Sequence, residues 1–203
     1  MRKLRIIEHI SLDGVIQAPG GPDEDRDGDF AYGGWAAPHH DPAVGAAIGT
    51  AHGARFDLLL GRHTYDIFAG YWPHQVGPMA DSLNSATKHV VTHRPDSLAW
   101  GPVADLGPDI VNGIGDVKAT DGPDLIVWGS SSLTPALIET GLADEVLLLV
   151  FPVLLGRGKP LFSHAAGARE LALVGTKAAP SGVLINTYRP AGPLRAWTIG
   201  EST

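Results

Sequence analysis

Short apolar runs that alternate with helical segments constrain the fold of this chain more than any other feature of its sequence. Buried strands are predicted at residues 4–10, 57–61, 88–93, 124–129 and 144–155. Helices are predicted from Pro42, with Asp41 as N-cap, and at residues 63–71 and 131–141. Two last strands, 170–179 and 183–190, are joined by Pro-Ser-Gly as a hairpin. We therefore predict an α/β fold with a mixed, mostly parallel sheet flanked by helices and an antiparallel C-terminal hairpin.

Composition narrows the class of protein. The chain has 203 residues, 44% hydrophobic and 18% charged, which suits a single domain over residues 1–203. Its formal charge of -7 argues against a nucleic-acid partner, which needs a basic face, and the absence of cysteine excludes disulfides and thiolate sites. The N-terminus lacks the pattern of a signal peptide, and the longest apolar run is shorter than the ~20 residues of a membrane helix. We expect a cytoplasmic protein with no nucleic-acid or membrane partner.

Two segments have little periodicity. Residues 11–40 are rich in Gly, Pro and Asp, and connections of this length in compact domains are usually functional or disordered. We expect this loop to shape the substrate side of a site. The tail, residues 190–203, is punctuated by Pro and Gly, although Leu194, Trp197 and Ile199 indicate some packing on the body.

Groups that bind anions follow three of the predicted strands. The first set is Gly61, Arg62, His63 and Thr64; the second is Thr92, His93 and Arg94; the third is Gly129, Ser130, Ser131 and Ser132. Ligands of open α/β sheets bind outside the carboxyl ends of the strands, and a basic strand end suits the extra phosphate of NADP. Each set alone could be an ordinary loop, and the serines could simply cap a helix. Together, in this order, they predict a phosphate-binding cleft.

The motifs also resemble a known family. "GRHTY" is similar to the phosphate-binding motif of dihydrofolate reductases, and "SLDG" from Ser11 to the first-strand motif of the wider dihydrofolate-reductase-like superfamily. The segment "GLADEVLLLVFPVLLGRGKPLF" resembles the C-terminal reductase domain of the bifunctional riboflavin-biosynthesis deaminase-reductase. The resemblance implies NADPH as hydride donor, a pyrimidine- or pterin-like substrate, and a homodimer. The resemblance also implies that Leu133 binds the coenzyme, together with the third set of residues, Gly129 to Ser132.

Two departures from that family leave the substrate open. No carboxylate occurs around residues 43–49, where dihydrofolate reductases carry one on the first helix, and Asp41 lies too early, at the cap. Trp128 stands where the riboflavin-pathway reductases usually have a glutamate. The alternatives are therefore a true dihydrofolate reductase and a non-catalytic NADPH-binding protein.

Candidates for the substrate side come mainly from the long loop. Asp13, in "SLDG", is the candidate for a catalytic proton donor or substrate contact; its competing interpretation is a turn residue, because Asp-Gly favours turns. Phe30, Tyr32 and Trp35 are candidate substrate-binding aromatics, or else hydrophobic anchors of the loop, with Gly33 and Gly34 as a hinge. Trp128 would face nicotinamide or substrate, or lie in the core.

A metal site is not expected. Asp23, Asp25, Asp27 and Gly28 fall at the spacing of the first ligands of a calcium-binding loop, but Gly34 stands where the closing glutamate is needed. We interpret this segment as a solvated acidic loop. The histidines show no metal-ligand spacing, and Ser130–Ser132 has no nucleophile-elbow motif around it.

Overall fold

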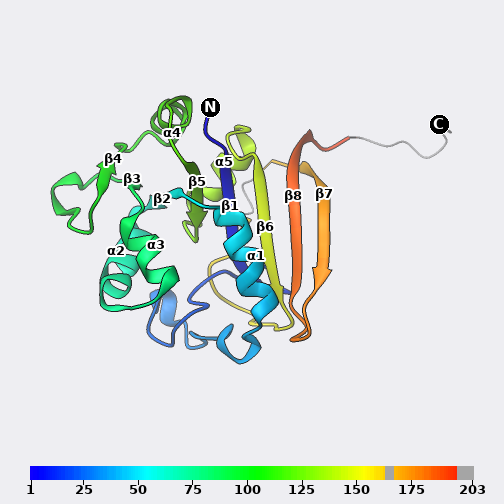
Figure 1. Ribbon diagram of the computed structural model, residues 1–203. Coiled ribbons are helices and arrows are strands. Elements are labelled where there is room, and N and C mark those ends of the chain that lie inside the picture. Colours follow the sequence, from blue (N-terminus) through cyan, green and yellow to red (C-terminus); the bar gives the residue numbers. More distant parts are fainter. Residues whose placement is uncertain (163–166, 196–203) are drawn as a thin grey trace.

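The computed structural model describes residues 1–162 and 167–195 and contains one eight-stranded sheet (Figure 1). The strands have the order β4-β3-β2-β5-β1-β6-β8-β7. They are β1 (Leu4–Ser11), β2 (Phe56–Gly61), β3 (Lys88–Val91), β4 (Val103–Asp105), β5 (Asp124–Trp128), β6 (Glu145–Phe151), β7 (Arg169–Ala178) and β8 (Leu184–Pro193). The α-helices are α1 (Pro42–His52), α2 (Arg62–Tyr71), α3 (Pro78–Ser85), α4 (Ile110–Ala119) and α5 (Thr134–Glu139). Single 3₁₀ turns lie at Asp27–Asp29, Ala37–His39, Trp72–His74 and Pro95–Ser97.

The predicted fold class is confirmed. Strands β1 to β6 pair in parallel, whereas β8 is antiparallel to both β6 and β7. Helical crossovers return the chain to the same end of the sheet after β2, β4 and β5, so the parallel strands have their carboxyl ends at one edge. In Figure 1 this is the lower edge, where the blue loop of residues 11–40 also lies.

Two hydrophobic clusters cover the two faces of the sheet. One receives Val44 and Ile48 of α1, Tyr65 of α2 and Leu83 of α3. The other receives Ile114 of α4 and Leu137 of α5, among others. Because side chains of a strand alternate between faces, β1 contributes Ile7 to the first cluster and Ile6 and Ile10 to the second. The central strands are therefore buried on both sides, which explains their continuous apolar sequence.

Some element bounds differ from the prediction. The strand predicted to reach residue 155 ends at Phe151, since Pro152 cannot donate to the ladder. Helix α5 begins at Thr134, because residues 131–133 form a turn, and it ends as predicted before Gly141, whose φ is 72°. Strand β4, which has three residues, and helices α3 and α4 were not predicted.

The C-terminal hairpin is longer than predicted. Strand β8 runs to Pro193, so the first residues assigned to the tail belong to the sheet. Leu194 is 61% exposed, contrary to the packing expected of it, while Trp197 and Ile199 lie outside the described residues. Strand β6 is internal to the sheet, because it pairs with β1 on one side and β8 on the other. The homodimer stays a prediction.

No helix in the described parts of the chain has both the length and the apolar character needed to cross a membrane.

Candidate functional site

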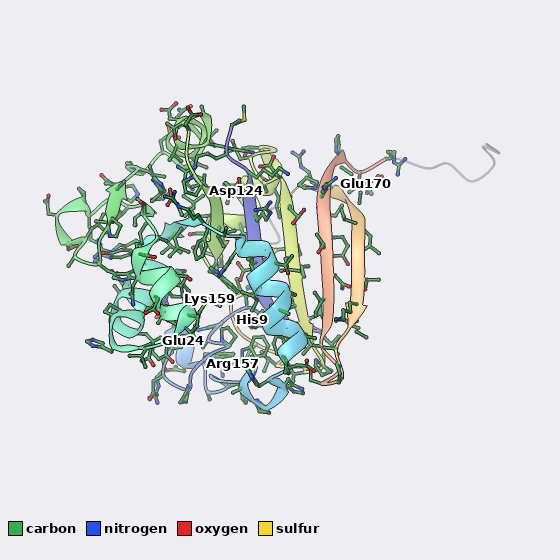
Figure 2. The ribbon with its side chains drawn as sticks, viewed as in Figure 1. His9, Glu24, Asp124, Arg157, Lys159 and Glu170 are labelled. Atoms are coloured by element: carbon green, nitrogen blue, oxygen red, sulfur yellow. The ribbon has the colours of Figure 1, made fainter. Side chains whose placement is uncertain are left out.

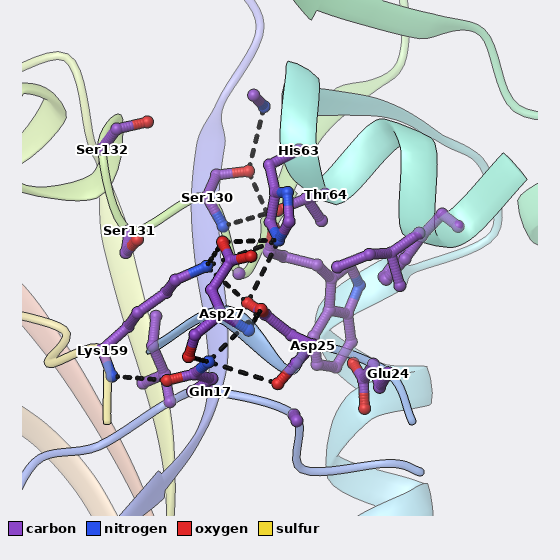
Figure 3. Close-up of a pocket in the computed structure, with 17 residues that line it drawn as sticks. Gln17, Glu24, Asp25, Asp27, His63, Thr64, Ser130, Ser131, Ser132 and Lys159 are labelled. Carbon is purple, nitrogen blue, oxygen red and sulfur yellow. Dashed lines mark hydrogen bonds and ion pairs between the residues drawn. The ribbon is translucent and has the colours of Figure 1, made fainter. Parts of the chain in front are cut away.

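The three predicted anion-binding turns meet at the carboxyl edge of the sheet. The amide of Gly61 donates to Ser130 Oγ over 3.0 Å, and the amide of Ser130 donates to Thr64 Oγ1 over 2.9 Å (Figure 3). The first and third turns are thereby bonded directly to each other. A Cβ on Gly129 would lie 3.2 Å from Thr64 Oγ1, so the close approach of the two turns favours glycine there.

Arg62 ties the second turn to the first. Its guanidinium donates to the carbonyl oxygen of Arg94 over 2.7 Å and to Ser97 Oγ over 2.8 Å. It also pairs with Asp66, one helical turn along α2, at 2.7 Å. Arg62, predicted to grip the coenzyme phosphate, also borders a cavity at this edge, and these contacts brace the loops that follow β2 and β3.

The basic side chain left open at this edge is that of Arg94. It is 67% exposed, and its nearest carboxylate is that of Asp66, 3.6 Å away. His93 is exposed beside it, whereas Thr92 is buried and its Oγ1 accepts the amide of Arg94 over 3.0 Å. Thr92 thus shapes the turn, and the exposed side chains of Arg94 and His93 lie beside it.

Two adjoining cavities lie at these turns, and one of them also borders the long loop. The one beside the loop has a volume of about 370 Å³ and is bordered by Gly61, His63, Thr64, Gly129, Ser130, Ser131 and Ser132 on one side. Its other walls include Ile16, Phe68, Trp128 and the acidic loop. The second, of about 340 Å³, is bordered by all three turns, with Thr92, His93, Arg94 and Leu133 in its wall.

Hydrogen-bond donors remain open along this edge. Helix α2 begins at Arg62 without any side-chain cap, although its first amides have no partner within the helix. In the described chain, the amides of Ser131 and Ser132 donate to no protein acceptor. Amides at a helix N-terminus or in such a turn favour anions. The arrangement can therefore bind phosphate groups.

Asp13 lies away from both cavities. Its carboxylate accepts the amides of Leu155 and Gly156, at 3.2 and 2.6 Å, and the hydroxyl of Ser11 at 2.6 Å. The hydrogen bond from Ser11, helped by those from the two amides, lowers the pKa of Asp13. A carboxylate so held is a poor proton donor. This geometry fits the turn interpretation and does not bring Asp13 to the predicted substrate site.

The loop aromatics divide between core and surface. Phe30 and Trp35 are 3% and 8% exposed and belong to the hydrophobic cluster on the α1 face. Trp35 packs edge-on against Phe151, and its indole N–H donates to the carbonyl of Gln17 over 2.8 Å. Tyr32 is 49% exposed. None of the three borders either of the two cavities, so their geometry fits anchoring of the loop.

The predicted glycine hinge beside Trp35 is a close packing contact. A Cβ on Gly33 would lie 2.6 Å from the carbonyl oxygens of Gly21 and Pro22. The amide of Gly34 donates to the carbonyl of Ala18 over 2.8 Å. The loop is therefore closely packed on itself at this point.

Trp128 does border the loop-side cavity, and two histidines hold it in place. Its indole N–H donates to His52 Nε2 on α1 over 3.2 Å, and His9 of β1 stacks on it at 5.5 Å between ring centroids. Figure 2 shows His9 beneath helix α1. Burial lowers the pKa of both histidines to about 4, so both rings are neutral near pH 7.

A charged cluster that the sequence did not predict closes the cavity on its loop side. Lys159 Nζ lies 2.6 Å from Asp25 Oδ2 and 2.7 Å from Asp27 Oδ2, and His63 Nε2 lies 3.1 Å from the former oxygen (Figure 3). Burial opposes ionisation of Asp25, but the hydrogen bond from Lys159 and the nearby charges bring its pKa below the ordinary value. Asp25 is 9% exposed, so the interpretation as a fully solvated acidic loop is wrong for this residue.

The same side chains have the spacing of metal ligands. Ligand atoms of Asp25, Asp27 and His63 lie within 4.8 Å of one another. The ammonium group of Lys159, however, contacts both carboxylates directly and supplies the positive charge. Lys159, Asp25 and Asp27 therefore form an ion-pair cluster, with His63 beside it.

Glu24 is a further cavity residue that the sequence did not single out. Its Oε2 accepts the amides of Gly20 and Gly21, at 2.6 and 3.0 Å. Burial raises its pKa, in contrast to that of neighbouring Asp25. The opposite pKa shifts of these adjacent carboxylates follow from the folded loop, because the sequence "PDEDRD" contains no signal that separates them.

Comparison with known proteins agrees with this geometry. The model of the family described as the RibD C-terminal domain matches residues 2–185. Among curated proteins, the uncharacterized protein YyaP of Bacillus subtilis is 30% identical over 135 residues, which are 64% of this chain and 72% of YyaP.

Two solved structures share the fold. One is dihydrofolate reductase from Enterococcus faecalis complexed with NADP(H), with a TM-score of 0.61 and 16% identity over 93% of this chain and 96% of that one. The other is the diaminohydroxyphosphoribosylaminopyrimidine deaminase/5-amino-6-(5-phosphoribosylamino)uracil reductase of Thermotoga maritima, with a TM-score of 0.63 and 14% identity over 94% of this chain and 57% of that one. Identities this low establish a dihydrofolate-reductase-like fold and nothing finer.

Proposed function

The chain belongs to the RibD C-terminal domain family, and from this premise we propose that it is an NADPH-dependent reductase of a pyrimidine-like substrate. The observation that carries the proposal is the meeting of three turns around two adjoining cavities that share Gly61, His63 and Ser132. Phosphate-binding groups at one end and an apolar wall with Trp128 at the other suit a dinucleotide whose nicotinamide lies beside a flat substrate.

The residues present fit such a coenzyme. The uncapped start of α2 and the amides of Ser131 and Ser132 would hold the pyrophosphate. Arg94 and His93 would contact the 2′-phosphate, as a basic strand end does in sites that select NADP. When bound, the reduced nicotinamide supplies the hydride. The chain itself binds and orients both partners, and the loop cluster around Lys159 limits the entry of water.

The pyrimidine-like substrate is proposed from the site and from the named activity of the Thermotoga maritima relative in fold. Trp128, Phe68 and Ile16 give the loop-side cavity flat and apolar walls. A dihydrofolate reductase is disfavoured, because α1 carries no carboxylate. Its buried face consists of Val44, Ile48 and His52, and His52 is already bonded to Trp128.

The test is a fluorescence titration of the protein with NADPH and with NADH. We expect NADPH to bind more tightly, and Arg94→Ala to weaken NADPH about tenfold or more, since a hydrogen bond to a charged group contributes roughly 1.5–3 kcal/mol. The same substitution should leave NADH affinity unchanged. Equal affinities for the two coenzymes, or no binding of either, would overturn the proposal.

A matched control is Arg55→Ala. Arg55 is also an exposed arginine, but it precedes β2 at the opposite edge of the sheet. Its removal should not change NADPH affinity. NADPH oxidation is then followed with 5-amino-6-(5-phosphoribosylamino)uracil and with dihydrofolate. Tight NADPH binding without oxidation by either compound would favour the non-catalytic alternative.

A further inference from the structure

The buried carboxyl group of Glu8, on β1, accepts a hydrogen bond from the turn at Gly129. Glu8 lies in the middle of β1 and is 3% exposed. Its Oε2 accepts the amide of Gly129 over 3.1 Å, whereas Oε1 is buried and has no partner in the described part of the chain. Buried polar atoms without partners are rare in native proteins, and each calls for an explanation. Glu8 is not among the residues proposed above to bind the coenzyme, so its burial has no explanation there.

The turn that Glu8 contacts has an unusual backbone. Gly129 and Ser130 follow one another with φ of 55° each. A serine in this region is uncommon, and such a conformation persists only when its surroundings determine it. The hydrogen bonds that tie this turn to other elements of the sheet edge include those of the Ser130 amide to Thr64, the Gly61 amide to Ser130, and the Gly129 amide to Glu8. The first two come from α2 and β2, and Glu8 alone among them acts from β1.

The surroundings of Glu8 disfavour the ionised form of its carboxyl group. It lies on the face of β1 that carries Ile6 and Ile10, and Leu148 of β6 is its ladder partner. Leu133 and Leu137, from the turn and α5, are apolar members of the same cluster. Burial raises the pKa of Glu8 well above its ordinary value, partly opposed by the Gly129 amide, and no charged side chain of the described residues contributes. A neutral acid can accept the amide without repelling a nearby phosphate.

We propose that Glu8 is a positioning residue for the coenzyme: it holds the Gly129–Ser130 turn so that the open amides of Ser131 and Ser132 face the pyrophosphate. This inference rests on the proposed function. It also offers a structural counterpart to the missing glutamate at position 128, since a carboxyl group reaches the glycine turn from β1 instead.

The experiment compares Glu8→Gln and Glu8→Leu by NADPH titration and by urea unfolding. Glutamine keeps an acceptor for the Gly129 amide, so it should bind NADPH within about threefold of wild type. Leucine removes the acceptor and should weaken NADPH about tenfold or more. Stability should not follow affinity, because an apolar side chain in this cluster replaces a buried polar group and is tolerated or favourable. Glu145→Gln, which changes a carboxyl on the neighbouring strand, should leave NADPH affinity unchanged.

A pH series tests the same idea without a destabilised variant. As pH rises, ionisation of Glu8 should weaken NADPH binding to wild type relative to Glu8→Gln, in which the group cannot ionise. Equal NADPH affinity of Glu8→Leu and wild type, or parallel pH profiles of wild type and Glu8→Gln, would overturn the inference while leaving the proposed function intact. If wild type itself bound no NADPH, the premise would fail, and the inference with it.

Discussion

The site has a phosphate side and a loop side, and different kinds of contact hold them together. The phosphate side consists of turns that directly follow β2, β3 and β5, neighbouring parallel strands of one sheet. The loop side is held by contacts between residues far apart in sequence, such as Lys159 with Asp25 and Asp13 with Gly156. Topology alone brings the first set together, whereas the second exists only once the loop has packed against the segment after β6.

This difference has a functional consequence. Each phosphate-side turn is anchored by a strand buried on both faces, so it is rigid before the coenzyme arrives. The loop side combines polar contacts of Lys159 and Gln17 at the cavity with packing of Trp35 in the hydrophobic cluster. Substitutions on the phosphate side should therefore change coenzyme affinity, and those on the loop side should change stability or substrate selection.

The strongest test of this division is Thr64→Val on the phosphate side. The substitution keeps the shape of the side chain but removes the acceptor of the Ser130 amide in a buried environment. We expect a loss of about 2 kcal/mol in unfolding free energy, the cost of an unsatisfied buried donor. NADPH affinity should fall about tenfold or more, because the third turn is no longer tied to α2. Urea unfolding and fluorescence titration measure the two effects.

Thr64→Ser is the control for that substitution. It keeps the hydroxyl and removes only a methyl group, so NADPH affinity should stay within about threefold of wild type. If Thr64→Val bound NADPH as tightly as Thr64→Ser, the hydrogen bond between the turns would have no part in coenzyme binding.

Lys159→Met is the corresponding change on the loop side. It removes the ammonium group that pairs with the buried carboxylate of Asp25 and leaves His63 Nε2 3.1 Å from that carboxylate. Because Lys159 is 31% exposed, the expected loss is about 1–2 kcal/mol, less than for a fully buried pair. The pKa of Asp25 is lowered in the fold, so this loss should be largest above its unfolded pKa near 4 and shrink as pH falls.

The NADPH affinity of Lys159→Met should differ from that of Thr64→Val. It should change by less than about threefold, because the ammonium group is paired with two loop carboxylates, although it also lies 3.4 Å from His63 Nε2 of the first turn. Adding Asp25→Asn should recover part of the lost stability, since the unpaired charge is then removed. A large loss of NADPH affinity in Lys159→Met would show that the loop cluster belongs to the coenzyme site, and the division between the sides would fail.

The sequence predicted the phosphate side because its signals are local. Each turn follows an apolar run and precedes a helix, and the parallel sheet places all three at one edge. The exact role of Arg62 could not be predicted, since its partners Arg94 and Ser97 come from another loop. Glu8 did leave a local signal, a single acid within the apolar run "LRIIEHIS", whose meaning depends on the Gly129 amide above it.

The loop side could not be predicted for the opposite reason. Whether an aromatic residue of residues 11–40 lines a cavity or anchors the loop depends on the path of the loop, which Pro and Gly punctuate without specifying. Asp13 illustrates this: "SLDG" fits both a turn and a catalytic acid, and its partners are the amides of residues more than 140 positions away. Long-range contacts of this kind have no local pattern.

Asp13→Asn gives the smallest expected effect and separates those two interpretations. If Asp13 supports the segment after β6, the substitution should cost about 1 kcal/mol of unfolding free energy, the typical contribution of one hydrogen bond. Because the pKa of Asp13 is lowered in the fold, this cost should be present above pH 4 and disappear as pH falls below it. NADPH affinity and any NADPH oxidation with 5-amino-6-(5-phosphoribosylamino)uracil should be unchanged.

Asp23→Asn serves as the reference for Asp13→Asn, because Asp23 is a carboxylate of the same loop that is 71% exposed and paired with Arg26 alone. It should change neither stability nor turnover. Loss of NADPH oxidation in Asp13→Asn with unchanged stability would assign Asp13 a catalytic role after all. It would also mean that the loop side rearranges during turnover, since the carboxylate would have to leave the amides of Leu155 and Gly156 to reach the cavity.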